Sequence, residues 1–395
     1  TKCVPDELIP YMGLLGSTLS LMDTKNYTYP ELTNEININC GGLATGTALY
    51  SDKVDFSKNR IVYEVKSKAL YEKVPFVLGM MEEIMYNTRF DDYKRLKEII
   101  ARIKSRLEAS LMGQGHSIAM LECCAQFSES AYYSDEEFEQ NKTQIVDKLN
   151  KLVGYIFNKD NVIVSLTADD EGYDCFVKAL SAKSCNIKDE HYNTAVRSFI
   201  PVNVKTGYTS ASQVQYVARC GNFVKDGYKY TGALKVLKVI FSYDYLWINV
   251  RVKGGAYGCM SGSSRNGDFY MVSYRDPNLE KTNDIYEGAA DYIRNFNVSR
   301  RDMVKFIIGT IGEIDAPLTP SAIGSRSFTH YMCNCTEDML RKDREEVLDA
   351  TVESIRELAP LIESAVGQNY LCVVGNQKQI NEAADLFDEI KPLIG

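Results

Sequence analysis

Histidine is scarce in this sequence, and its spacing excludes the common zinc motifs of metallopeptidases. The chain has three histidines, His116, His191 and His330, and none has another histidine within five positions. Neither H-E-x-x-H nor H-x-x-E-H occurs, so no helix of the chain can present such a zinc site. We therefore predict no metal site in this chain, and we interpret His116 and His330 as ordinary helix or loop residues.

Other self-contained catalytic motifs are missing as well. The sequence has no G-x-x-x-x-G-K-[ST] phosphate loop and no G-x-S-x-G elbow. Gly113 and Gly115 begin a G-x-G pattern, but the third glycine of a dinucleotide-binding loop is absent and the segment follows a helix pattern. The sequence therefore predicts a chain without a complete catalytic apparatus of its own.

Composition excludes two classes of partner. The formal net charge is −8 and no basic cluster offsets it, whereas binding to phosphate backbones needs a basic surface. The longest apolar runs are interrupted by charge or are shorter than the ~20 residues that span a bilayer. We therefore expect neither a nucleic acid nor a membrane as a partner.

The cysteines indicate a reducing compartment. There are eleven, an odd number, and they are scattered along a chain of 395 residues, unlike those of a small disulfide scaffold. We interpret them as reduced thiols, as in a bacterial cytoplasm or an organelle matrix. The two close pairs, Cys123 with Cys124 and Cys333 with Cys335, are best explained by packing, because thiol-based metal sites usually need two regularly spaced pairs.

An internal repeat is the most informative pattern. Amphipathic helices are predicted at 95–111 and 302–314, and their Ile99-Ile100 and Ile307-Ile308 pairs are 208 positions apart. Three further pairs of features recur in the same order at offsets of 208 to 213: strand-like runs at 60–65 and 268–274 (each followed by a predicted helix, at 74–86 and 283–296), strand-like runs at 161–167 and 370–375, and the glycine pairs Gly41-Gly42 and Gly254-Gly255.

These recurrences predict an α+β fold of two tandem homologous α/β modules. Each module is expected to have a mostly antiparallel sheet with helices packed on one face, which buries the apolar side of the sheet. We predict the first module at 1–190 and the second at 198–395, with the boundary in the polar stretch 187–198.

The stretch RVKGGAYG at 251–258 combines cations, adjacent glycines and a tyrosine. A glycine pair is usually a turn, because glycine reaches backbone angles that other residues avoid. Alternatively, the turn presents Arg251 and Tyr257 to a ligand. The residues alone leave both interpretations open.

Three groups of long segments, in a fixed order, carry a resemblance to a known family. They are YMGLL, MDTKNYTYPEL and INCGG between residues 11 and 42, RVKGGAYG at 251–258, and SYRDPNL at 273–279 followed by FIIGTIGEIDAPLTPSAIGSRSF at 306–328. Together they resemble the C-terminal half of the pitrilysin/insulinase family of zinc metallopeptidases, in its presequence-protease branch. The similarity covers nearly the whole chain.

The resemblance implies an enzyme of four similar α/β domains in two halves that close around a chamber. It implies that zinc is bound by the N-terminal half, through an inverted motif and a distant glutamate, and not by this chain. It further implies that Arg251 and Tyr257 reach the substrate at that metal as catalytic residues. Gly254 and Gly255 would form the substrate-binding turn beside them, and Lys253 would be a solvated neighbour.

The chemistry of peptide hydrolysis suits these two residue types. Negative charge grows on the carbonyl oxygen in the tetrahedral transition state, and a preorganised donor stabilises it there. A tyrosine hydroxyl donates a proton without a counter-charge, and arginine offers a fixed fork of donors with a permanent charge. The equivalent stretch of the first module, CGGLATG at 40–46, lacks both residues, so we predict a structural role for that module.

We therefore expect the chain to be the non-catalytic half of a zinc metalloendopeptidase that degrades unstructured peptides in a closed chamber. Alone it should have no peptidase activity, and its partner should be the zinc-bearing N-terminal half. The first residue, Thr1, favours excision from a longer chain. The alternative is a separately encoded, inactive subunit that binds peptides or assembles with a catalytic half. An independent enzyme with an unrecognised site is the third interpretation.

Overall fold

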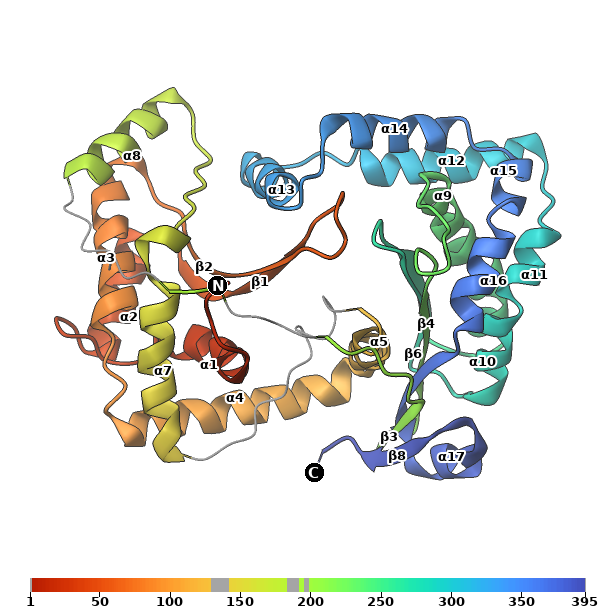
Figure 1. The fold of residues 1–395 in the computed structure, drawn as a ribbon, viewed down its shortest axis with the longest axis horizontal. Coiled ribbons are helices and arrows are strands. Elements are labelled where there is room, and N and C mark those ends of the chain that lie inside the picture. The colour runs from red at the N-terminus through yellow and green to blue at the C-terminus, as the bar shows by residue number, and fades with distance from the viewer. Residues whose placement is uncertain (1, 129–141, 183–191, 195–198, 395) are drawn as a thin grey trace.

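The computed structural model describes residues 2–128, 142–182, 192–194 and 199–394, and its elements form two parts that lie side by side (Figure 1). The first part comprises strands β1 (Leu43–Ser51) and β2 (Asn59–Ser67) with helices α1 (Pro10–Thr18), α2 (Tyr29–Asn39), α3 (Val74–Asn87), α4 (Tyr93–Gly113), α5 (Gly115–Ala125), α7 (Lys142–Ile156) and α8 (Asp170–Ala182).

The second part contains the larger sheet and the remaining helices. Its strands are β3 (Thr206–Ser210), β4 (Tyr216–Asn222), β5 (Gly258–Ser263), β6 (Asp268–Tyr274), β7 (Tyr370–Asn376) and β8 (Glu389–Pro392). Its helices are α9 (Ala233–Ile240), η4 (Phe241–Tyr245), η5 (Trp247–Val252), α10 (Glu280–Glu287), α11 (Ala289–Arg294), α12 (Arg300–Ile314), α13 (Pro320–Met332), α14 (Glu337–Leu348), α15 (Val352–Arg356), α16 (Ala359–Gly367) and α17 (Gln377–Glu382).

The first part is a helical cluster around one long hairpin. Strands β1 and β2 pair antiparallel from Leu43 opposite Ser67 to Ser51 opposite Asn59. Helix α2 begins with a capping box, in which the Thr28 side chain and the Glu31 carboxylate satisfy each other's backbone N–H groups. The apolar faces of α1, α3, α4 and α7 meet in one core of buried side chains, among them Leu15, Ile84, Ile99, Leu149 and Leu152.

The second part is built on a mostly antiparallel six-stranded sheet in the order β5-β6-β4-β7-β3-β8. Only β3 pairs in parallel, with β7 and β8. Successive residues of β4 point to opposite faces of the sheet. Val217 therefore joins a core that includes Tyr286 of α10 and Ile362 of α16, whereas Ala218 belongs to a separate apolar cluster on the other face.

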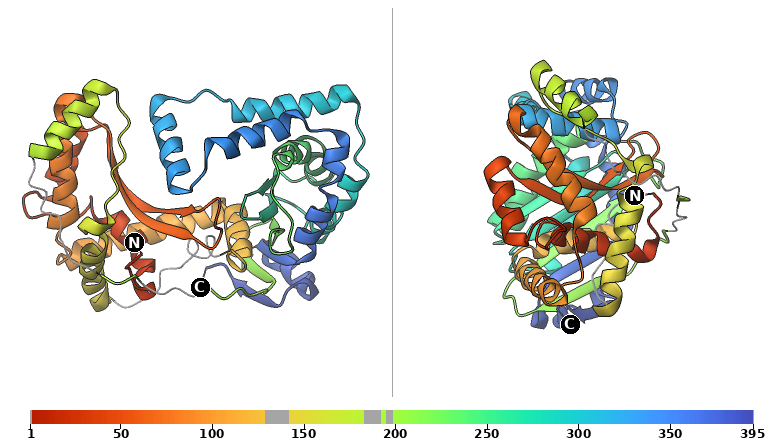
Figure 2. Two further views of the ribbon diagram at one scale, coloured as in Figure 1. Left: turned by 45° about the horizontal axis from the view of Figure 1, so that its top comes forward. Right: turned by 90° about the vertical axis from the view of Figure 1, so that its left-hand side faces the viewer.

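Helix α5 of the first part covers that other face. Its Ala119 and Cys123 are fully buried in one cluster with Ala218, Cys220 and residues of β6 and β7. Helix α4 runs along the lower edge of the molecule and carries the chain from the first part to α5 (Figures 1 and 2). The sequence analysis predicted helices on one face of each sheet and did not foresee that a helix from the first part covers the second sheet.

A second contact joins the two parts at the tip of the β1–β2 hairpin. Tyr50 of β1 packs in an apolar cluster with Met332 and Cys333 at the end of α13. The Lys53 N–H donates to the Cys333 carbonyl at 2.7 Å, and the Asn334 side-chain amide donates to the Asp52 carboxylate. The two parts are therefore linked both through α5 and through the hairpin.

The structure confirms the predicted α+β class and most of the recurring elements. The helices at 95–111 and 302–314 lie within α4 and α12, and the strands at 60–65, 268–274 and 370–375 are β2, β6 and β7. In both parts a helix leads through a glycine pair into two antiparallel strands, and the second glycine has a positive φ, 114° at Gly42 and 84° at Gly255.

One predicted strand is wrong. Residues 162–169 form neither helix nor strand, although 161–167 has the pattern of β7. A strand needs a neighbour to pair its N–H and C=O groups. Among the described residues no third strand extends the β1–β2 pair, and the side chains of Ile163 and Val164 are 54% and 57% exposed.

The helix predicted at 283–296 is interrupted. It consists of α10 and α11 with a break at Gly288, where the Tyr245 hydroxyl donates to the Ile285 carbonyl at 2.5 Å. That carbonyl would otherwise accept the intrahelical bond from Ala289. The helix is thus broken by a side chain from outside it, a cause that the local pattern could not show.

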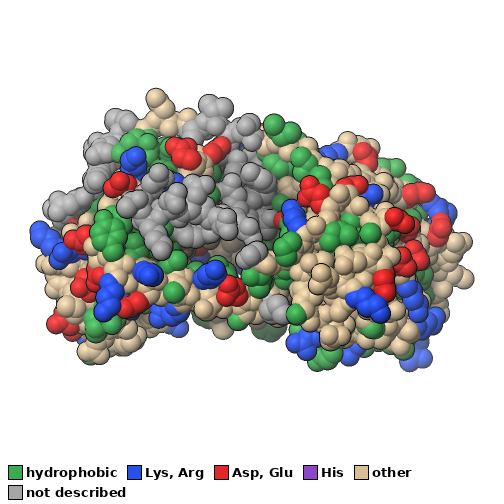
Figure 3. All heavy atoms as spheres, turned by 90° about the horizontal axis from the view of Figure 1, so that it is seen from below, with side chains coloured by type: hydrophobic (Ala, Val, Ile, Leu, Met, Phe, Trp, Pro, Cys, Tyr) green, Lys and Arg blue, Asp and Glu red, His purple; other side chains and the backbone are tan. Residues whose placement is uncertain are grey.

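The predicted module boundary at 187–198, like His191, lies largely outside the described residues and stays a prediction. None of the described helices is long and apolar enough to cross a bilayer. On the face shown in Figure 3, acidic and basic side chains are interspersed among apolar ones.

Candidate functional site

The RVKGGAYG turn joins a helix to the first residue of an edge strand. The helix that begins as α9 widens into the π-helical segments η4 and η5, and the Lys253 N–H donates to the Ile248 carbonyl at 2.9 Å. Such π-helical turns are rare and frequent at functional sites. The chain reverses through Gly254 and Gly255, and β5 begins at Gly258.

Both glycines are required by the geometry of this turn, for different reasons. A Cβ at Gly254 would lie 2.4 Å from the Val250 carbonyl oxygen, so no side chain fits there. Gly255 has a φ of 84°, a conformation that L side chains rarely adopt. Its N–H donates to the Arg251 carbonyl at 2.8 Å, which closes the end of the helix.

The SYRDPNL loop, which follows β6, supports the turn from below. The Asn278 side chain donates to the Gly254 carbonyl at 2.6 Å, and the Tyr257 N–H donates to the Arg275 carbonyl at 3.2 Å. The fully buried Asp276 carboxylate anchors this loop by accepting bonds from the Asn278 N–H and the Thr282 hydroxyl. Burial raises the pKa of Asp276, although these hydrogen bonds oppose the shift.

The turn brings Arg251 and Tyr257 close together. The Arg251 guanidinium carbon lies 3.9 Å from the centre of the Trp247 ring and 5.9 Å from the centre of the Tyr257 ring. Tyr257 packs edge-on against Tyr274, with ring centres 5.8 Å apart. The two candidate catalytic residues therefore form one cluster with two further aromatic side chains.

The cluster faces solvent and has chemistry to spare. Tyr257 is 68% exposed, and Lys253 is exposed as expected for a solvated neighbour. Within the described chain, no carboxylate forms an ion pair with Arg251. Its charge still acts on Cys259, where burial raises the thiol pKa to about 11 and Arg251 opposes the shift. That Arg251 and Tyr257 contact a substrate stays a prediction.

The equivalent turn of the first part has a different environment. A Cβ at Gly41 would meet the Lys68 side chain at 2.7 Å, and the Gly41 N–H donates to the Lys68 carbonyl. The backbone plan is shared, but the stretch CGGLATG carries no arginine and no tyrosine.

The histidines do not converge on a site. The His116 ring packs edge-on against Tyr274 at 4.8 Å, and His330 lies on α13. Burial is the main cause that lowers the pKa of both rings. In the residues that the structure describes, no three His, Cys, Asp or Glu side chains could hold a metal ion together, so these residues do not fit a zinc site. The described cysteines are all free thiols.

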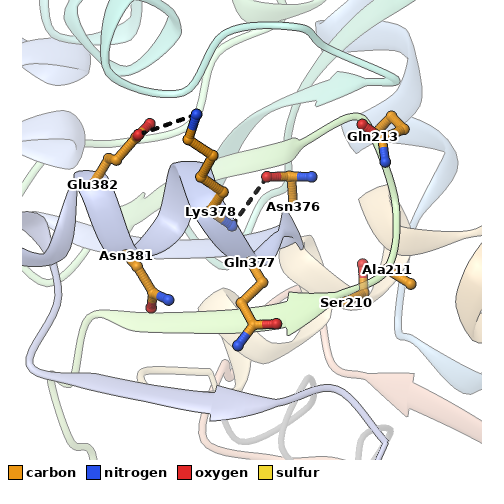
Figure 4. A pocket seen from close by; sticks show the side chains of 8 residues that line it. All are labelled: Ser210, Ala211, Gln213, Asn376, Gln377, Lys378, Asn381 and Glu382. Atoms are coloured by element: carbon orange, nitrogen blue, oxygen red, sulfur yellow. Dashed lines mark hydrogen bonds and ion pairs between the residues drawn. The ribbon is translucent and has the colours of Figure 1, made fainter.

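A polar pocket of about 610 Å³ lies away from this cluster, at the ends of β3 and β7 (Figure 4). The Asn376 side-chain oxygen accepts a bond from the Lys378 N–H there, and Lys378 pairs with Glu382 at 3.6 Å. These contacts cap and brace the short helix α17, so the pocket is explained by local structure.

The sequence analysis missed three residues of the cluster and its support. Trp247 was passed over because it stands in an apolar run, although it is the only tryptophan and is four positions before Arg251. Asn278 and Tyr274 stand in the SYRDPNL string, which was noted for its resemblance only. Their contacts with the turn depend on strand pairing that single segments do not reveal.

Two family descriptions match the chain. "PreP C-terminal domain" matches residues 207–376, and a domain described as associated with M16 peptidases of subfamily C matches residues 1–149. The protein HypA of Clostridium perfringens is 38% identical, over 100% of this chain and 42% of its own length. "Presequence protease 1, chloroplastic/mitochondrial" of Arabidopsis thaliana is 28% identical, over 98% of this chain and 38% of its own length. The chain thus spans about two fifths of these relatives.

Solved structures support the fold. A peptidase M16 inactive domain from Pseudomonas fluorescens superposes with a TM-score of 0.58 at 13% identity, covering 96% of this chain and 88% of that one. Pitrilysin superposes with a TM-score of 0.60 at 11% identity, covering 93% of this chain and 38% of the pitrilysin chain. At these identities the likeness concerns the fold alone.

Proposed function

The chain belongs to the M16 peptidases of the presequence-protease type, as their C-terminal half, and on this premise we propose that it supplies substrate contacts to a zinc metalloendopeptidase without binding the zinc. The observation that carries the proposal is the pairing of Arg251 with Tyr257 on an exposed, glycine-built turn. The N-terminal half is the partner that holds the metal, and the chain alone is inactive.

In this proposal the Tyr257 hydroxyl donates to the carbonyl oxygen of the scissile peptide bond. The charge on that oxygen grows toward the tetrahedral transition state, so a fixed donor stabilises the transition state more than the ground state. Arg251 donates from its fork to an adjacent backbone carbonyl or carboxylate of the substrate. The N–H donors of Arg251 are available for this because no carboxylate of the described chain pairs with them.

Gly254 and Gly255 set the position of both groups. Because neither glycine carries a side chain, a peptide strand can approach the turn closely. We propose unstructured peptides as substrates, since only an extended chain can lie between this turn and the partner half in a closed chamber. A bacterial cytoplasm or an organelle matrix suits both the free thiols and the presequence-protease relatives.

The test is a complementation assay. This chain is mixed with a zinc-bearing N-terminal half, and cleavage of an unstructured fluorogenic peptide is followed. We expect no cleavage by the chain alone, cleavage by the mixture, and a loss of about 10²–10³ in kcat for Tyr257→Phe, because one transition-state donor is removed.

Tyr243→Phe is the matched control, because Tyr243 is also exposed, at 69%, but is not part of the cluster. Its kcat should equal that of the wild type. Cleavage by the chain alone, or an unimpaired Tyr257→Phe, would show that the assignment of the turn is wrong.

A further inference from the structure

Trp247 occupies a special position beside the proposed site. It is the only tryptophan of the chain and is in the same π-helical segment as Arg251, one turn earlier. Its ring lies under the guanidinium at 3.9 Å and is 39% exposed. Tryptophan is the aromatic side chain that binds a stacked cation most strongly.

Other arginines of the second part are held by different means. Arg219 is buried and donates to the Asn283 side chain, the Glu287 carboxylate and the Val366 carbonyl. Arg265 lies over the Tyr230 ring but also pairs with the Asp343 carboxylate. In both cases acceptors within the chain occupy the N–H donors.

Arg251 is anchored without that loss. The stacked ring contacts the face of the guanidinium, whereas its N–H bonds point outward in the plane of the group. Tyr257 alone could not provide this anchor, because it lies farther away, at 5.9 Å, and is more exposed, at 68%. Stacking on Trp247 therefore fixes the cation while leaving its hydrogen-bonding edge free.

We propose that Trp247 is a positioning residue, which holds the Arg251 guanidinium by its ring face so that its N–H donors meet the substrate backbone. The inference rests on the proposed function of Arg251 and adds a residue that acts only through it. Trp247 itself need not touch the substrate.

The stack can be tested by fluorescence, because the chain has a single tryptophan. Emission is recorded for the wild-type chain, Arg251→Leu and the matched control Lys253→Leu, which removes an exposed cation two residues away. We expect Arg251→Leu to change the emission maximum or intensity and Lys253→Leu to leave both unchanged. An Arg251→Leu spectrum identical to that of the wild type would show that the stack is absent in solution, and would overturn the inference.

The role of the stack is tested by kinetics in the complemented enzyme. Trp247→Leu should lower kcat/KM about five- to tenfold, the scale of a lost cation–π contact. Trp247→Phe should recover most of the loss, because phenylalanine keeps an aromatic face. In an Arg251→Ala background Trp247→Leu should have no further effect. Equal unfolding temperatures of the Leu and Phe variants would show that the difference is not one of folding.

The outcomes separate the two proposals. A loss in Trp247→Leu that persists in the Arg251→Ala background would overturn the positioning role and leave the proposed function standing. Failure of Trp247→Phe to recover activity in a folded variant would also count against the stack. Full activity of Arg251→Ala would overturn the proposed function, and the inference with it.

Discussion

At the residue scale, the turn before β5 depends on two glycines that meet different constraints. The obstacle to a side chain at Gly254 is space, because a Cβ would press on the Val250 carbonyl oxygen. At Gly255 the obstacle is backbone conformation, because its φ is 84°. The two constraints together fix where Arg251 leaves the helix and where Tyr257 enters the strand.

Gly254→Ala should therefore move the turn rather than only strain it. Overpacking of this kind typically costs about 1–3 kcal/mol of stability. A displacement near 1 Å of a substrate-contacting group can cost about 10²-fold in rate, which we expect for the complemented enzyme. Unfolding by denaturant and peptide cleavage measure the two effects.

Gly312→Ala is the control, because a Cβ at this position within α12 would meet nothing within 4 Å. It should leave cleavage unchanged and stabilise the chain by about 0.5–1 kcal/mol, since alanine favours a helix interior over glycine. Wild-type activity in Gly254→Ala would contradict the tight fit of the turn.

At the scale of elements, local patterns predicted what local forces decide. The helix at 95–111 was predictable because Leu96 and Ile99 repeat at helical spacing, and both are buried. Yet Leu107, on the same predicted face, is 52% exposed, because α4 extends beyond the core of the first part toward α5. Arg251, Gly254, Gly255 and Tyr257 were predicted from a resemblance, whereas Trp247 and Asn278 emerge only from the folded geometry.

The docking of α5 on the large sheet is equally a tertiary effect, and it can be tested. A Cβ at Gly115 would lie 2.3 Å from the Tyr216 ring, so Gly115→Ala should force the helix away from β4. We expect a loss of about 1–3 kcal/mol in the free energy of unfolding. Thermal and urea unfolding provide the measurement.

Gly113→Ala, two residues earlier, is the matched variant, because a Cβ there would meet nothing within 4 Å. It should unfold at the wild-type temperature or slightly above it. If both alanine variants behaved alike, the close packing of α5 on Tyr216 would not hold in solution.

At the scale of the whole molecule, residues 162–166 expose a run of apolar, strand-forming side chains. Val162, Ile163, Val164 and Leu166 are each more than 40% exposed. Such a segment without a pairing partner is prone to self-association, as edge strands are. In the assembled enzyme this surface would be free to meet another chain segment.

We expect this chain, studied alone, to associate in a concentration-dependent way, and Val164→Lys to reduce that association. A charge in an exposed apolar run opposes strand pairing at small cost to folding. Val304→Lys is the control, because Val304 is 44% exposed on α12, outside the run. Sedimentation at several concentrations measures the effect, and equal association of the two variants would exclude the segment as its cause.

The covering of the large sheet by α5 also limits where such a chain can be divided. A cut at the repeat boundary near 187–198 would put α5 and the sheet on two products and uncover one face of the sheet, with Ala218, Cys220 and Val374 exposed. A cut on the N-terminal side of α1 would leave them together. Although the chain carries two recurring modules, it can be inherited only as one unit, because the helix that completes the second module is encoded within the first.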